Sequence, residues 1–139
     1  MTDVGGPDGT TMRQRAREIA DALAAGWTKG RVEDIAALFT DTAVLLETPF
    51  GAPVNGLEAI RKWAGDIPYY QSEATFTTGE VFVAGPWFST EFKLVFRRRT
   101  TGDWVDARGA FFAETDGQKI TELRMYWHRW TGGREITVP

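Results

Sequence analysis

The residue in this sequence that most invites chemistry is Glu47, a carboxylate at the end of an apolar run. The stretch Asp41–Gly51 (DTAVLLETPFG) predicts a short strand, roughly 43–47, that stops at Pro49 and Gly51. Two interpretations follow. Either the strand has already emerged into solvent at Glu47, or the side chain enters an apolar pocket, where it could serve as a general base. Most ionisable residues lie at the surface, so the first interpretation is the more common one.

The composition excludes several classes of function. The chain has one histidine and no cysteine, so we expect no metal site, no thiol chemistry and no disulfide framework. A net charge of −3 gives no basic surface for nucleic acid. There is no apolar run of membrane-spanning length and no signal-peptide pattern. We therefore expect a cytoplasmic protein with no cofactor, no nucleic-acid partner and no membrane partner.

The elements that would position Glu47 begin with helices. Thr11 and Gln14 form a capping-box pattern, apolar residues then recur at helical spacing as far as Trp27, and Gly30 is the stop signal. A second, shorter helix is predicted through Val32, Ile35, Ala36 and Phe39. Residues 1–9 are rich in glycine and aspartate and predict a disordered tail. The remaining residues, 10–139, are one domain by length.

A third helix is predicted after the turn that follows Glu47. Asn55 and Glu58 form another capping-box pattern, and the helix would run through Leu57, Ile60 and Trp63. Tyr69 and Tyr70 then fall in a segment that we expect to be mobile, with Pro68 just before it. A tyrosine hydroxyl there could donate to a ligand.

Four β-rich stretches follow, at roughly 73–83, 86–99, 103–115 and 118–131. Their short links require antiparallel neighbours, because parallel strands need long crossovers. Three helices followed by a meander predict an α+β fold, with the helices on one face of a strongly curved, mainly antiparallel sheet.

Strand alternation assigns side chains to the two faces of the sheet. One face of the second long strand carries Phe88, Thr90, Phe92, Leu94 and Phe96. On the last strand, Leu123, Met125 and Trp127 oppose an amphipathic set of Arg124, Tyr126, His128 and Trp130. Such a set is typical of protein–protein surfaces, so we expect a homodimer through the outer sheet face. His128, the single histidine, is predicted to be structural or interfacial.

The order of elements resembles the nuclear-transport-factor-2-like fold, and four motifs sharpen the likeness. Trp27–Phe39 (WTKGRVEDIAALF) is similar to the "W-N-x-G-D-x-D-x-x-x-x-L-F" stretch of SnoaL-like polyketide cyclases and ketosteroid isomerases. The motifs Asp41–Val44, Val54–Ile60 and Asp116–Trp127 resemble the next signatures in the same order. The resemblance implies a cone-shaped roll around a deep, mostly apolar pocket.

The resemblance places Glu47 where ketosteroid isomerases carry their catalytic aspartate, which favours the pocket interpretation. It also implies departures. The hydrogen-bonding tyrosine of the isomerases would align with Leu23 and their protonated aspartate with Ala110. The inward acid of cyclases and limonene-epoxide hydrolases would fall at Met125. These three positions, all expected to line the substrate pocket, lack the polar groups of those specific mechanisms.

Further candidates remain on the inward register predicted for the third long strand. Asp106 and Arg108 share a face with Ala110 and Phe112. Arg108 could stabilise a developing oxyanion while Asp106 orients it, or the two could form an exposed ion pair worth about 0–1 kcal/mol. Glu73 falls near the second carboxylate of polyether cyclases, although a solvated strand-end charge is the more common interpretation. Further pocket-lining candidates, which could equally be core residues, are Trp63, Tyr69, Tyr70, Phe92 and Trp127.

Two functions of different classes follow. The first is a cofactor-independent acid–base enzyme (an isomerase, cyclase or epoxide-opening enzyme) that acts on a hydrophobic polyketide- or steroid-like molecule, with Glu47 as general base. The second is a non-catalytic protein that holds a small apolar ligand in the same pocket. The sequence does not identify a substrate.

Overall fold

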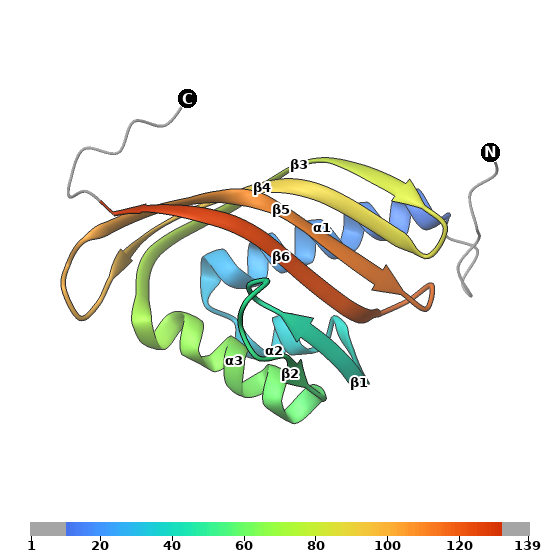
Figure 1. The fold of residues 1–139 in the computed structure, drawn as a ribbon, viewed down its shortest axis with the longest axis horizontal. Helices are drawn as coiled ribbons and strands as arrows, with labels where there is room; N and C mark the ends of the chain where they lie inside the picture. Colours follow the sequence, from blue (N-terminus) through green and yellow to red (C-terminus); the bar gives the residue numbers. More distant parts are fainter. Residues whose placement is uncertain (1–10, 132–139) are drawn as a thin grey trace.

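The computed structural model describes residues 11–131 (Figure 1). The predicted tail at 1–9 lies outside these residues. The elements in chain order are α1 (Met12–Lys29), α2 (Val32–Ala36), β1 (Phe39–Leu46), β2 (Val54–Asn55), α3 (Leu57–Tyr70), β3 (Gln71–Ala84), β4 (Trp87–Arg98), β5 (Trp104–Thr115) and β6 (Ile120–Thr131). None of these helices is long and apolar enough to cross a membrane. The predicted α+β class is confirmed.

A single six-stranded sheet in the order β2-β1-β6-β5-β4-β3 forms the frame of the molecule. The meander from β3 to β6 is antiparallel throughout, as predicted, whereas β1 runs parallel to β6. The long strands arch over α1, and all three helices lie on the concave side of the sheet (Figure 1). The concave face is called the inner face below, and the opposite one the outer face.

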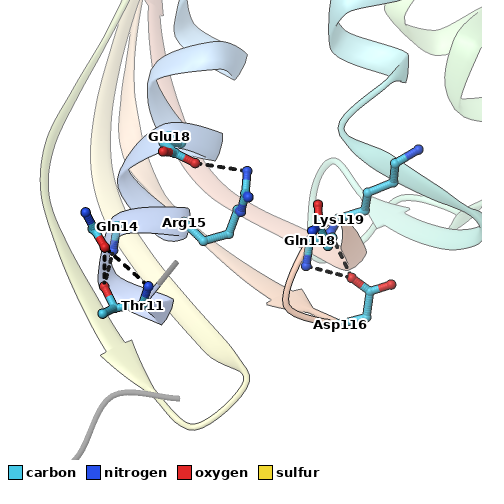
Figure 2. Close-up of polar contacts among 7 residues, drawn as sticks. All are labelled: Thr11, Gln14, Arg15, Glu18, Asp116, Gln118 and Lys119. Atoms are coloured by element: carbon cyan, nitrogen blue, oxygen red, sulfur yellow. Dashed lines mark hydrogen bonds and ion pairs between the residues drawn. The ribbon is translucent and has the colours of Figure 1, made fainter. Parts of the chain in front are cut away.

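Helix α1 begins and ends where its sequence signals predict. The Thr11 hydroxyl accepts a hydrogen bond from the Gln14 backbone N–H at 3.2 Å, and the side-chain oxygen of Gln14 accepts one from the backbone N–H of Thr11 (Figure 2). Gly30 ends the helix in the left-handed conformation (φ 65°), which glycine adopts without a steric penalty. One side of α1 is buried, with Ala16, Ile19, Ala20, Leu23 and Trp27 packed into the core.

Three predicted boundaries are wrong. Phe39 begins β1 rather than ending α2, because α2 stops at Ala36. Asn55 pairs with Val44 as part of the short strand β2, and Gly56 caps α3 without any side-chain hydrogen bond. The third helix also continues through Pro68 to Tyr70, so the tyrosines that were expected in a mobile segment lie in the last helical turn.

Alternation in the strands is confirmed by burial. On β4, Phe88, Phe92 and Leu94 are at most 4% exposed, and the outward residue Glu91 is exposed. Phe92 lies at the centre of an aromatic cluster on the inner face: its ring stacks on Phe76 at 5.1 Å and lies 6.2 Å from both Phe111 and Trp127. Many of the aromatic side chains of the chain therefore pack in one large aromatic core.

Gly109 marks a close approach of two strands opposite this cluster. It pairs with Phe92 on β4 and with Trp127 on β6. A Cβ atom at position 109 would overlap the carbonyl oxygen of Tyr126 and lie 2.7 Å from the Cα of Trp127. Only glycine lets β5 and β6 approach this closely, and the indole of Trp127 occupies the inner side of the strand at that point.

The turn between β5 and β6 is held by Asp116. Its Oδ1 accepts hydrogen bonds from the backbone N–H groups of Gln118 and Lys119 at 2.9 and 2.8 Å (Figure 2). These bonds, that from Lys119 most strongly, lower the pKa of the Asp116 carboxyl because they stabilise its ionised form. The adjacent Thr115 hydroxyl donates to the sulfur of Met12, which fixes the turn against the start of α1.

Candidate functional site

Glu47 directly follows β1, in which Ala43 and Leu45 are both fully buried on the inner face. The residue itself is half-buried. Among residues 11–131, no hydrogen bond or ion pair involves its carboxylate. A half-buried carboxylate without a partner is uncommon, because most are paired or fully solvated.

Trp127 fixes the backbone beside this carboxylate. Its indole N–H donates to the carbonyl oxygen of Glu47 at 2.8 Å, across 80 residues of sequence. The indole belongs to the inner face, because Trp127 pairs with Gly109 and its ring lies 6.2 Å from that of Phe92. β6 therefore holds the end of β1 in place, and with it the point from which the Glu47 side chain leaves the backbone.

Five predicted pocket residues belong to the inner side of the sheet. Leu23, Phe92 and Met125 are at most 4% exposed. Trp63 and Trp127 are half-buried and pack against the core. Trp63 of α3 meets Trp27 of α1 edge-to-face at 5.5 Å. These side chains provide apolar walls on the side of the sheet that Glu47 adjoins.

The inward register predicted for Asp106, Arg108, Ala110 and Phe112 is wrong. On β5 the inner face belongs to the odd-numbered residues, for example Ala107 opposite the buried Leu94. Arg108 donates to both carboxylate oxygens of Asp106, at 3.0 and 2.8 Å, and is exposed on the outer face. This bond raises the pKa of the Arg108 guanidinium.

The other two outward residues of β5 also lie away from the inner face. Phe112 is 43% exposed and meets Tyr126 edge-to-face at 5.9 Å, and Ala110 pairs with Tyr126 and Glu91. The error arises because alternation gives two faces but does not say which one a polar and apolar mixture such as DARGAFF presents to the core.

Glu73 also lies away from the inner face. It is exposed, has a positive φ of 53° within an irregular stretch of β3, and forms an ion pair with the outward Arg97 at 3.6 Å. The structure therefore supports the interpretation of Glu73 as a solvated charge at the end of a strand.

Tyr69 and Tyr70 are 70% and 49% exposed and contact each other edge-to-face at 4.7 Å.

The comparisons with known proteins give the family and the fold of the chain. The family model described as the SnoaL-like domain matches residues 20–123, which include both Glu47 and the strands around it. The chain belongs to the SnoaL-like family. No curated protein matches the sequence.

Solved structures place the SnoaL-like chain in the nuclear-transport-factor-2-like fold. A putative isomerase from Bacillus subtilis is 21% identical with a TM-score of 0.74, covering 82% of this chain and 86% of that one. A Delta 5-3-ketosteroid isomerase from Mycobacterium sp. is 19% identical with a TM-score of 0.70, covering 85% and 98%. The epoxide hydrolase/cyclase-like enzyme SalBIII is 18% identical with a TM-score of 0.75, covering 84% and 93%. At these identities the likeness shows the fold.

Arg129 is the residue that sequence reasoning missed in this SnoaL-like chain. It pairs with the fully buried Ala107, so it leaves β6 on the inner face, and its guanidinium lies 5.0 Å from the centre of the Trp127 ring. The alternation that placed Trp127 inward also places Arg129 inward, two residues further on, so the signal was present in the sequence.

The grooves with described linings lie on surfaces of the SnoaL-like domain that do not include Glu47. One of about 890 Å³ runs between α1 and β3, with Arg17, Glu80 and Val81 among its lining residues. Two more grooves lie along strands β3, β4 and β5, and both are lined by Thr77 and Lys93. No group of three or more His, Cys, Asp or Glu side chains that could hold a metal occurs within residues 11–131.

Proposed function

We propose that this SnoaL-like protein is a cofactor-independent acid–base enzyme. Its substrate would be a hydrophobic polyketide- or steroid-like molecule bound against the inner face of the sheet, with Glu47 as the general base. The observation that carries the proposal is the half-buried Glu47 directly after β1, whose carboxylate has no hydrogen-bond or ion-pair partner among residues 11–131. In this fold, named isomerases and a cyclase-like enzyme are among the similar structures.

The surroundings of Glu47 suit proton transfer. A general base needs a carboxylate that no cation neutralises and that apolar walls keep from full hydration, because both conditions preserve its basicity. Trp127 holds the backbone on one side. The carboxylate would remove a proton from a carbon or hydroxyl of the bound molecule and return it at another position, so the reaction would be an isomerisation, a cyclisation or an epoxide opening.

The test compares Glu47→Gln with the wild type on a panel of polyketide-like and steroid-like substrates. The amide keeps the shape of the side chain and removes its basicity. We expect kcat to fall by about 10²–10⁴-fold with nearly unchanged ligand affinity. Glu91→Gln is the matched control, because Glu91 is exposed on the outer face, and it should leave kcat unchanged. Full activity in Glu47→Gln would contradict the assignment.

A second candidate function, ligand binding without catalysis, has its own support. Leu23 and Met125, which occupy positions where relatives with known mechanisms were expected to carry polar groups, are buried apolar residues, and Ala110 faces outward. The structure of a computationally designed 17-OHP binder, 20% identical with a TM-score of 0.73, covers 86% of this chain and 98% of its own. A binding protein predicts ligand affinity without turnover in the wild type.

We also infer that the outer sheet face pairs with a second copy of the chain. The face carries three partly exposed aromatic residues, Phe112, Tyr126 and Trp130 at 43%, 40% and 51%. Four charged side chains there form local pairs, Asp106 with Arg108 and Glu122 with Arg124. Aromatic residues among arginines are enriched at interfaces, and a two-fold axis would bury the same patch on both copies. A cytoplasmic location remains a prediction.

A further inference from the structure

We propose that Arg129 binds an anionic group of the ligand, so that the natural ligand is an apolar molecule with one carboxylate or similar oxyanion. This inference deepens the proposed function and rests on it for the location of the ligand at the inner face. It assigns to Arg129 a role in recognition, distinct from the proton transfer assigned to Glu47.

Arg129 lies on the inner register of β6. Directly paired residues of antiparallel strands point to the same face of the sheet, and Arg129 pairs with Ala107, which is 0% exposed. Arg129 is nevertheless exposed. A residue on the inner register that is exposed lies where the inner face opens to solvent, which is where a ligand would enter.

Arg129 has no carboxylate partner among residues 11–131. On the outer face, Arg97, Arg108 and Arg124 each form an ion pair with an acidic residue. Among residues 11–131, the contact of the Arg129 guanidinium is its stacking on Trp127 at 5.0 Å. The stacking orients the guanidinium and leaves the N–H donors at its edge free to bind a ligand.

Trp127 connects Arg129 to Glu47. The Trp127 indole contacts the Arg129 guanidinium with its ring and the Glu47 carbonyl with its N–H. One indole therefore contacts both the Arg129 guanidinium, which has no ion-pair partner among the described residues, and the backbone of the candidate base. A ligand whose apolar body lies against Trp127 could place an anionic group at Arg129 while a reacting atom approaches Glu47. Guanidinium groups match the planar geometry of carboxylates and bind them with two parallel hydrogen bonds.

The experiment uses two dyes that differ by one charge. Anilinonaphthalene sulfonate is anionic, and phenylnaphthylamine is the same molecule without the sulfonate. Fluorescence titrations would give the affinity of both dyes for the wild type and for Arg129→Met, which keeps an apolar stem against Trp127. We expect Arg129→Met to weaken the anionic dye by about tenfold, the scale of one charge-assisted pair at a partly exposed site. The uncharged dye should change by less than about twofold, because no charge is lost in its contact.

Arg124→Met is the matched control. Arg124 lies on the same strand, is exposed and also stacks on a tryptophan, Trp87, at 5.2 Å, but it faces outward and is paired with Glu122. It should leave the affinities of both dyes unchanged. The inference is overturned if Arg129→Met changes both dyes equally or neither, if Arg124→Met has the same effect, or if the wild type binds neither dye at millimolar concentration.

The result can be separated from that of the proposed function. If Glu47→Gln keeps full turnover while Arg129→Met still loses the anionic dye selectively, the base assignment fails and the anion site stands. If Glu47→Gln abolishes turnover and Arg129→Met leaves the dye selectivity intact, the enzyme stands and the anion site fails. In addition, Glu47→Gln should strengthen the anionic dye relative to the uncharged one, because a nearby like charge is removed.

Discussion

Replacing Gly109 with alanine should destabilise the protein by about 3 kcal/mol, the upper part of the range for overpacking. The new Cβ would overlap the Tyr126 carbonyl oxygen and lie 2.7 and 2.8 Å from the Cα and Cβ of Trp127. Two of these three atoms are backbone atoms of β6, so no side-chain rotation relieves the clash. β6 is hydrogen-bonded to β1 on one side and β5 on the other, so any shift of this strand breaks ladder bonds.

The assay is urea unfolding followed by circular dichroism, with a thermal melt beside it. A loss of about 3 kcal/mol should lower Tm by about 10 °C in a chain of this size. Gly65→Ala is the control: Gly65 lies inside α3, and a Cβ there would meet nothing within 4 Å. It should stabilise the protein by about 0.5–1 kcal/mol, because alanine is the better helix former. If Gly109→Ala lost less than about 1 kcal/mol, β5 and β6 would not be as close as described.

Two further predictions concern the turn at Asp116 and the outer face. The lowered pKa of Asp116 means that its ionised form stabilises the folded state above the unfolded pKa of about 3.9, and that this contribution is lost as the pH falls through the lower folded pKa. Asp116→Ala should therefore be less stable than the wild type at neutral pH, and the difference in urea titrations should shrink as the pH falls below about 4 and through the lower folded pKa; a constant difference at all pH values would refute this cause. Tyr126→Glu on the outer face should convert a dimer to a monomer in light scattering at micromolar concentration, whereas Glu80→Gln, away from that patch, should not; a monomeric wild type would refute the dimer.

Local sequence signals predicted the elements well where one residue determines the backbone. The capping box at Thr11 and the left-handed Gly30 gave both ends of α1, because each satisfies backbone groups that a helix leaves free. The pattern at Asn55 and Glu58 misled because Asn55 is used by β2 instead. That pairing depends on β1, which lies outside the few residues around Asn55 that form the capping pattern.

Glu47 remains a predicted site residue, whereas the predicted face of Asp106 and Arg108 is wrong for a physical reason. Glu47 follows two buried residues of its strand, Ala43 and Leu45, so its face could be counted. On β5 both faces carry apolar side chains, since Phe111 is buried and Phe112 is exposed. The predicted register was off by one residue, so Asp106 and Arg108 were predicted on the inner face although they lie on the outer one. Arg129 carries no local motif of its own, and its place on the inner face follows from its pairing with Ala107 on β5.

The parallel pairing of β1 with β6 has a consequence for how the chain is made. Phe39 pairs with Ile120 and Leu46 with Arg124, so the edge of β1 that faces β6 stays unpaired until nearly the whole chain has left the ribosome, although β2 can already pair with the opposite edge. Closing a loop of this length is slow compared with forming the neighbouring hairpins, and contacts so distant in sequence lower the folding rate. The bond from Trp127 to Glu47 forms across the same span. The carboxylate proposed to do the chemistry is thus fixed in place only when the last strand docks, and a chain that stops early cannot have an assembled site.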